Sequence, residues 1–153
     1  MSRAVSTVLG VLLLTALTLA LATVAGVGVL SAAPPTVQRP VVLSASADAS
    51  TGRIVLVHES GPTIDVRDVE VRIAVDGRRL PYQPTVPFYS ARGFASFPSG
   101  PFNPVADPRW EFGERASLEV TGVNAAPLSP GSTVRVEVYR DDLPLSVVET
   151  TAR

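Results

Sequence analysis

The sequence predicts a mainly β protein with one N-terminal α-helix of transmembrane type and an external β-sandwich. Three observations predict this class. An apolar run occupies about the first thirty residues, a proline-rich stretch follows it, and the hydrophobic period then changes from helical to two. We expect four parts: a short leader over residues 1–4, a helix over 5–33, a linker over 34–40, and a β-domain over 41–153.

The first element is the apolar run. No residue from Ala4 to Gln38 is charged, and the stretch from Val5 to Leu30 contains eight Leu and six Val. A helix rises about 1.5 Å per residue, so about twenty residues cross a hydrocarbon core of about 30 Å. Each central Leu or Val favours insertion by roughly 0.3 to 0.6 kcal/mol. We therefore expect residues 5–33 to form a hydrophobic transmembrane or filament-core helix.

A cleaved secretory signal is one simpler interpretation of this run. Arg3 would supply the basic region, and Ala20-x-Ala22 or Ser31-x-Ala33 would supply a small-residue cleavage site. The apolar core of such signals is about 7 to 15 residues long, which is much shorter than this run. A cut after Ala33 would also leave Pro34 next to the scissile bond, where its fixed φ makes a poor substrate.

A plain single-span anchor is the other simple interpretation. Arg3 precedes the run and Arg39 follows it after several residues, so the positive-inside rule places the C-terminal domain outside the cell. Pro34 and Pro35 end the helix, because proline lacks an N–H and disfavours helix in the residue before it. The linker over 34–40 then forms a short, semi-rigid spacer.

Alternating hydrophobic residues define the strands of the β-domain. Val69 to Val75 alternates with polar residues and ends at the turn signal Asp76-Gly77, while Val134 to Val138 alternates after Pro130-Gly131. Shorter strands are predicted at Val41 to Ala47, Arg53 to His58, Ala116 to Thr121, and Leu145 to Thr150. With no convincing helix after residue 33, these strands predict a β-sandwich of immunoglobulin-like arrangement.

A long loop over residues 81–110 interrupts this pattern and holds seven of the fourteen prolines and seven of the nine aromatic residues. Loops of this length are usually functional or disordered, and the aromatic content argues against disorder. One interpretation folds the loop over one end of the sandwich, with Phe88, Phe94, Phe97 and Trp110 closing the core. The other is a subunit contact or adhesive surface. Its candidate residues are Tyr82, Phe88, Tyr89, Phe94, Phe97, Phe102 and Trp110.

The residue types that support catalysis are sparse. The absence of cysteine excludes disulfides, thiol catalysis and cysteine-rich zinc sites, and a net charge of -1 does not indicate a nucleic-acid surface. His58, the only histidine, is expected to be a solvated residue at a strand end. Asp65, Asp68 and Glu70 lack the spacing of a calcium loop and are interpreted as ordinary turn and strand-face carboxylates. We expect no enzyme activity, metal site or cofactor.

The start of the chain, "RAVSTVLGVLLL", places a basic residue and a small residue directly before a long apolar helix. This pattern resembles the N-terminus of archaeal type IV pilins, especially those of halophilic archaea. In that family a prepilin peptidase cuts a class III signal peptide on the cytoplasmic side and leaves the helix on the mature protein. The resemblance implies processing around Arg3, Ala4 and Val5. The sequence departs from the common family form at Thr7, where the family has Pro, and at Leu9, where it has Ile.

The resemblance also implies partners, a location and a role. The precursor would enter the cell membrane and then assemble, through an assembly ATPase and a membrane platform, with further copies or other pilins. The product would be an extracellular surface filament that serves adhesion or surface contact. "HESGPTIDVRDVEVRIAVDG" resembles external domains of haloarchaeal pilin-like proteins. The alternative is a non-assembling, single-span surface protein whose β-sandwich binds a ligand or a protein.

Small residues of the helix are the candidates for close contact between subunits. Helices in an apolar bundle gain little hydrophobic energy over lipid, so they pack through small side chains. The candidates are Gly10, Ala16, Ala20, Gly26 and Gly28.

Overall fold

The computed structural model describes residues 2–30, 40–124 and 128–153, and within the N-terminal helix it describes the side chains of residues 7–23. The chain divides into two compact units, residues 1–38 and 39–153. The boundary between them falls inside the predicted linker. Each unit is described by itself.

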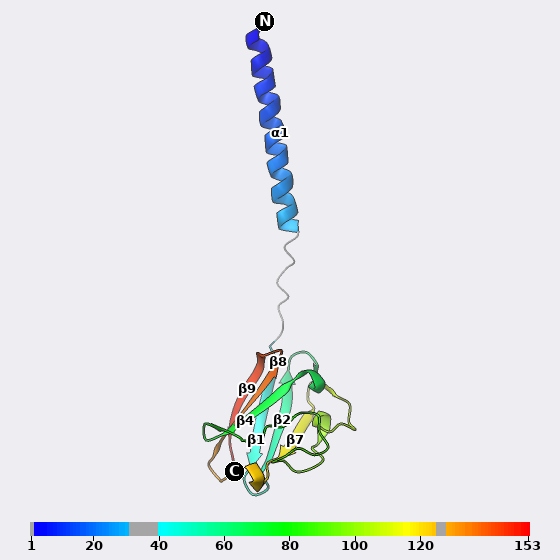
Figure 1. The fold of residues 1–153 in the computed structure, drawn as a ribbon, viewed down its shortest axis with the longest axis vertical. Helices are drawn as coiled ribbons and strands as arrows, with labels where there is room; N and C mark the ends of the chain where they lie inside the picture. Colours follow the sequence, from blue (N-terminus) through cyan, green and yellow to red (C-terminus); the bar gives the residue numbers. More distant parts are fainter. Residues whose placement is uncertain (1, 31–39, 125–127) are drawn as a thin grey trace. The chain divides into compact units, whose positions relative to one another are not determined.

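The first unit is the helix α1, Ser2–Leu30 (Figure 1). It begins before the predicted residue 5, because nothing in Ser2, Arg3 or Ala4 opposes helix formation. Residues 31–33, where we expected the helix to end, and residues 34–39 of the linker lie outside the described residues. Within the part of the chain that the structure describes, no helix combines the length and the apolar character that a membrane crossing requires.

The second unit consists mainly of two antiparallel sheets (Figure 1). One has the order β1-β2-β7, with β1 at Val42–Asp48, β2 at Arg53–Ser60 and β7 at Arg115–Glu119. The other has the order β5-β4-β8-β9, with β5 at Arg78–Arg79, β4 at Glu70–Val75, β8 at Thr133–Arg140 and β9 at Leu143–Thr151. A small third sheet pairs β3, Ile64–Asp65, with β6, Arg109–Trp110.

The six strands that alternation predicted are all present, with ends shifted by a residue or two. Strands β3, β5 and β6 were not predicted, because a strand of two residues is too short to show a hydrophobic period. Three short 3-10 helices also went unpredicted, at Val66–Asp68, Gly100–Phe102 and Gly122–Asn124. The mainly β class and the single α-helix are confirmed for the described residues.

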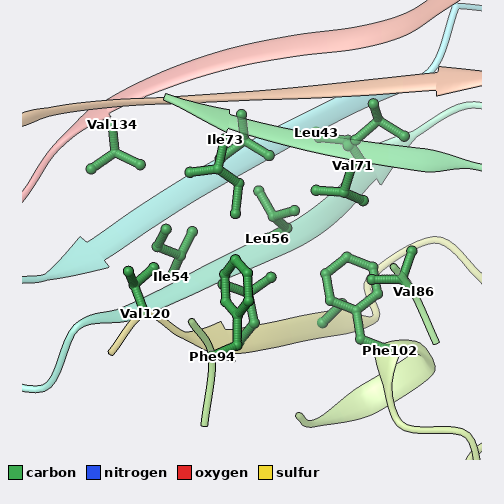
Figure 2. Close-up of a cluster of buried hydrophobic side chains, with 14 of the residues drawn as sticks. Leu43, Ile54, Leu56, Val71, Ile73, Val86, Phe94, Phe102, Val120 and Val134 are labelled. Atoms are coloured by element: carbon green, nitrogen blue, oxygen red, sulfur yellow. The ribbon is translucent and has the colours of Figure 1, made fainter. Parts of the chain in front are cut away.

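The core lies between the two larger sheets, because strands β1, β2, β4, β7 and β8 turn apolar side chains inward. Val71 of β4 lies opposite Val138 of β8, and Ile73 lies opposite Val136, and all four are buried. Figure 2 shows Phe94 and Phe102 from the long loop pointing into the same cluster as Leu56 and Ile73. The loop therefore contributes to the core as the strands do.

The two larger sheets meet along one side through a short parallel contact. Ala47 at the end of β1 bridges Ala152, just after β9. The amide of Ala49 donates to the carbonyl of Arg153 at 2.8 Å, and the amide of Arg153 donates to the carbonyl of Ala47 at 3.1 Å. These bonds satisfy backbone groups at the end of the chain and fix how the sandwich closes.

Gly100 marks the point where the long loop packs against β7. Its φ is +65°, and a Cβ built there would lie 2.0 Å from the carbonyl oxygen of Arg115. Gly113 provides a matched comparison, because its φ is +82° while a Cβ there would meet nothing within 4 Å. Of these two glycines, Gly100 alone combines a left-handed backbone with a steric block.

We predict that Gly113→Ala lowers the free energy of unfolding by about 1 to 2 kcal/mol, the cost of a left-handed L residue. Gly100→Ala should lower it by about 3 kcal/mol or more, because the loop must also move away from β7. Urea unfolding of the full chain, followed by the fluorescence of Trp110, measures both losses. Equal losses for the two variants would contradict the close approach of the loop to β7.

Candidate functional site

The long loop covers the outer edge of β7. The amide of Ala95 donates to the carbonyl of Glu119 at 2.9 Å, and Ser99 and Ser117 exchange two backbone hydrogen bonds at 3.0 and 3.1 Å. Their hydroxyls lie 2.6 Å apart. An exposed strand edge is a template for pairing with other chains, so this cover protects the sheet from unspecific association.

Two polar side chains hold the first half of the loop. Asn124 is fully buried; its Oδ1 accepts from the amide of Tyr82 at 2.9 Å, and its Nδ2 donates to the carbonyl of Gly93 at 2.9 Å. The side-chain amide of Gln83 accepts from the N–H of Ile73 and donates to the same residue's carbonyl, as a neighbouring strand would. The loop is thus tied to the sandwich by bonds that replace strand pairing.

Four rings of the loop belong to the core. Phe88, Phe94, Phe102 and Trp110 are at most 6% exposed, and Phe102 meets Trp110 in a T-shaped contact with centroids 5.4 Å apart. The core-closing interpretation is therefore confirmed for Phe88, Phe94 and Trp110. The contact role that we considered for all four of these rings is wrong, since buried rings present no surface to a partner.

Phe97 was also expected to close the core, and this prediction is wrong. Its side chain is 69% exposed, and it meets the exposed Tyr89 with ring centroids 6.4 Å apart. The reason is local: Phe97 has φ +60°, a rare conformation for a bulky residue, and its amide donates to the carbonyl of Tyr89 at 2.8 Å. Tyr82, the remaining candidate, is half-buried under the guanidinium of Arg92, 4.2 Å from its ring centroid.

A small surface depression of about 130 Å³ lies beside Phe97. Its lining includes Ser99 and Ser117 from the covered edge, and Arg53 and Glu119, which are direct cross-strand partners in β2 and β7. Among the described residues, the guanidinium of Arg53 and the carboxylate of Glu119 take part in no ion pair and no side-chain hydrogen bond. The depression therefore combines an exposed ring with a free donor group and a free acceptor group.

Sequence reasoning did not identify Arg53 or Glu119 as site residues. Arg53 lies beside the buried Ile54 at the start of β2, so alternation predicts that it faces outward. Alternation does not give the register between β2 and β7, which brings the two charged residues together.

The outer face of the second sheet also gathers charges, but these are paired with one another. Arg135 donates to Glu137 at 2.8 Å and to Glu149 at 3.0 Å, and Arg72 donates to Glu70 at 2.6 Å. The hydrogen bond from Arg135 is the main reason why the pKa of Glu137 lies below its usual value. Satisfied pairs of this kind mark a solvated sheet face rather than a binding site.

The acidic residues near β3 follow the same pattern. Arg67 donates to both carboxylate oxygens of Asp65, and this lowers the pKa of Asp65 to about 2. Across residues 2–30, 40–124 and 128–153, no three His, Cys, Asp or Glu side chains are grouped as metal ligands.

His58 is fully buried, so the expectation of a solvated residue is wrong. Strand β2 continues to Ser60, which makes position 58 the next inward position after Ile54 and Leu56. The turn at Glu111–Glu114 covers it, because His58 exchanges backbone hydrogen bonds with Glu114 and Gly113. Neither ring nitrogen has a hydrogen-bond partner in the described structure, and the ring centroid lies 6.1 Å from that of Trp110.

The described side chains of α1 are exposed, whereas the apolar side chains in the core of the second unit are buried. Every one from Thr7 to Thr23 is exposed, including Ala16 and Ala20, and a Cβ at Gly10 would meet nothing within 4 Å. The large apolar ones, between 57% and 68% exposed, are Val8, Leu9, Val11, Leu12, Leu13, Leu14, Leu17, Leu19 and Leu21.

The remaining candidates of the helix lie near its two ends. Arg3, Ala4 and Val5 belong to the backbone of α1, as do Gly26 and Gly28, but their surroundings lie outside the described residues. The predicted processing and packing roles of these five residues therefore stay predictions.

A comparison with protein-family models gives no match for this chain, and a comparison with curated proteins gives none either.

We predict that His58→Leu raises the free energy of unfolding by about 1 kcal/mol, because it removes two unpaired buried nitrogens at similar volume. His58→Ala is the control and should lower the stability, since it leaves a cavity beside Trp110. Thermal unfolding of the full chain measures both changes. A loss for His58→Leu as large as that for His58→Ala would show that the imidazole makes a stabilising polar contact.

Proposed function

We propose that the chain is the structural subunit of a type IV pilus-like surface filament, with its helix packed among the helices of other copies and its β-domain outside. The observation that carries this proposal is the apolar surface of α1. The described side chains of residues 7–23 include no charge, and all are exposed. A helix that is apolar all round is normally buried in a large core or in lipid. Such a surface needs cover that other molecules provide.

The hydroxyl groups of the helix support cover by an apolar environment. The Oγ1 atoms of Thr15, Thr18 and Thr23 each donate within hydrogen-bond distance of the carbonyls three and four residues before them, at 2.8 to 3.1 Å. Polar groups without water must be satisfied internally, and these three hydroxyls are. Lipid around the precursor and neighbouring helices in a filament would both suit this surface.

The N-terminal pattern supports the choice of a filament. Residues 3–14 resemble archaeal type IV pilins, which implies membrane insertion of a precursor and a cut by a prepilin peptidase around Arg3, Ala4 and Val5. An assembly ATPase and a membrane platform would then build the filament. Gly10 offers a site where another helix can approach closely, because its position has open space within its own chain.

The strand order supports an immunoglobulin-like external domain. Numbering the strands of such a sandwich A to G, the sheet β1-β2-β7 corresponds to A-B-E, and the sheet β5-β4-β8-β9 corresponds to C′-C-F-G. Domains of this architecture are common on cell surfaces, where their loops and edges make contacts. An adhesive or surface-contact role fits such a domain at the outside of a filament.

One observation favours the second candidate, a surface protein that is anchored by its helix and does not assemble. The depression beside Phe97, with its unpaired Arg53 and Glu119, is a feature that a ligand-binding domain would use without any filament. Both candidates place the β-domain outside the cell. They differ in whether the chain is recovered from filaments sheared off the surface.

The substitution Leu17→Asp tests the proposed cover of the helix. Leu17 lies within α1 and is 58% exposed within its own chain, so the change leaves the β-domain intact. An acidic residue at the centre of an apolar environment costs about 2.5 to 3.5 kcal/mol. We predict that sheared filaments contain little or none of this variant, measured by immunoblot of the sheared fraction, whereas Leu17→Met assembles normally. Unchanged filament yield with Leu17→Asp would contradict a buried helix.

A further inference from the structure

Three side chains line the depression beside Phe97. They are the exposed ring of Phe97, which packs edge-on against Tyr89, and the guanidinium of Arg53 and the carboxylate of Glu119, which take part in no ion pair among the described residues. We propose that this depression binds a carbohydrate, with a sugar ring against Phe97 and sugar hydroxyls bonded to Arg53 and Glu119. The inference deepens the proposed function and rests on it, since a glycan ligand is met by a domain that faces the cell exterior.

The polar groups select a neutral polyol. A guanidinium only donates hydrogen bonds and a carboxylate only accepts them, whereas each hydroxyl of a sugar does both. Neighbouring sugar hydroxyls can therefore satisfy Arg53 and Glu119 together. An anionic ligand would meet Glu119, and Asp48 also lies directly across from Arg53, where Ser50 and Thr51 already donate to its carboxylate.

The ring of Phe97 supplies the apolar part of the site. The face of an aromatic ring carries partial negative charge, which attracts the C–H groups that line one face of many pyranoses. The backbone of Phe97 is held at φ +60°, and its amide bond to the carbonyl of Tyr89 pins the position. Bulky residues rarely adopt this conformation, and such strain gathers at functional sites. Tyr89 packs against the ring and orients it.

Size favours a small ligand over a protein partner. The depression measures about 130 Å³, which is below the roughly 300 to 1,000 Å³ that is usual for sites enclosing a drug-sized ligand. A stable protein interface needs about 800 Å² of surface from each partner. Beside the depression, the loop offers only Tyr89 and Phe97 as rings that are more than half exposed in the described residues. One sugar ring, lying partly in the depression at the end of a longer glycan, matches this scale.

The test is a direct binding experiment with the full chain in detergent micelles. An array of immobilised neutral oligosaccharides ending in glucose, galactose or mannose identifies a binder, and titration with that oligosaccharide gives the dissociation constant. Phe97→Asn removes the ring while keeping a residue that tolerates a left-handed backbone, and Phe97→Trp keeps a ring. Phe112→Asn is the matched control, because Phe112 is 73% exposed and does not line the depression.

We expect Phe97→Asn to weaken binding at least about tenfold, which corresponds to ~1.4 kcal/mol. Glu119→Gln should weaken it severalfold, because the charged acceptor is lost, while Phe97→Trp and Phe112→Asn should bind as the parent chain does. No binding to any glycan on the array, or equal binding by the parent chain and Phe97→Asn, would overturn the inference. So would a partner protein that binds through Phe97 when no glycan does.

Filament yield separates this inference from the proposed function. Phe97→Asn leaves α1 unchanged, so its sheared filaments should appear at the parent level even when glycan binding is lost. Intact filaments that bind no glycan would overturn the carbohydrate site and leave the filament role standing. Glycan binding by a chain that never enters filaments would overturn the filament role and leave the carbohydrate site standing.

Discussion

The apolar surface of α1 is the constraint on which the rest of the account depends. From Thr7 to Thr23 the helix has no charged side chain, and all of its described side chains are exposed. Such a surface is unstable in water, because roughly 25 cal/mol favours removal of each Å² of apolar area. The hydroxyls of Thr15, Thr18 and Thr23 are bonded to backbone carbonyls of the helix, so these three groups do not need water as a partner. Cover by lipid or by other chains would remove this cost, and the proposed function depends on such cover.

The β-domain differs from the helix, because it buries its apolar side chains within its own core. Two sheets and the aromatic loop bury a continuous core, and the loop also protects the edge of β7 through Ser99 and Ala95. A domain closed in this way can be carried on the outside of an assembly without unspecific association. Arg53, Phe97 and Glu119 lie around one depression of its surface. In the proposed function, assembly would belong to the first unit and recognition to the second.

Alternation predicted the strands because each strand has one buried face, as Ile73 and Val136 show. The same rule places His58 inward after Leu56, but the polarity of its side chain led us to expect exposure to solvent. Its burial depends on a turn that covers it, and no local sequence pattern reveals that turn. The aromatic content of the loop predicted a contribution to the core. It could not tell that Phe97 alone among the four expected rings turns outward, because this depends on one backbone angle. The pairing of Arg53 with Glu119 depends on strand register, which alternation leaves open.

The mature N-terminus tests the filament account most directly. Mass spectrometry would determine it for protein from the host's own membrane fraction and from filaments sheared off the cell surface. A filament subunit should start at or next to Val5 in both fractions, with α1 retained. A chain that starts near Pro34 and is released from the cell would contradict it, because the helix would then be a discarded signal. A start at Met1 or Ser2 with nothing in the sheared fraction would contradict it in favour of a plain anchor.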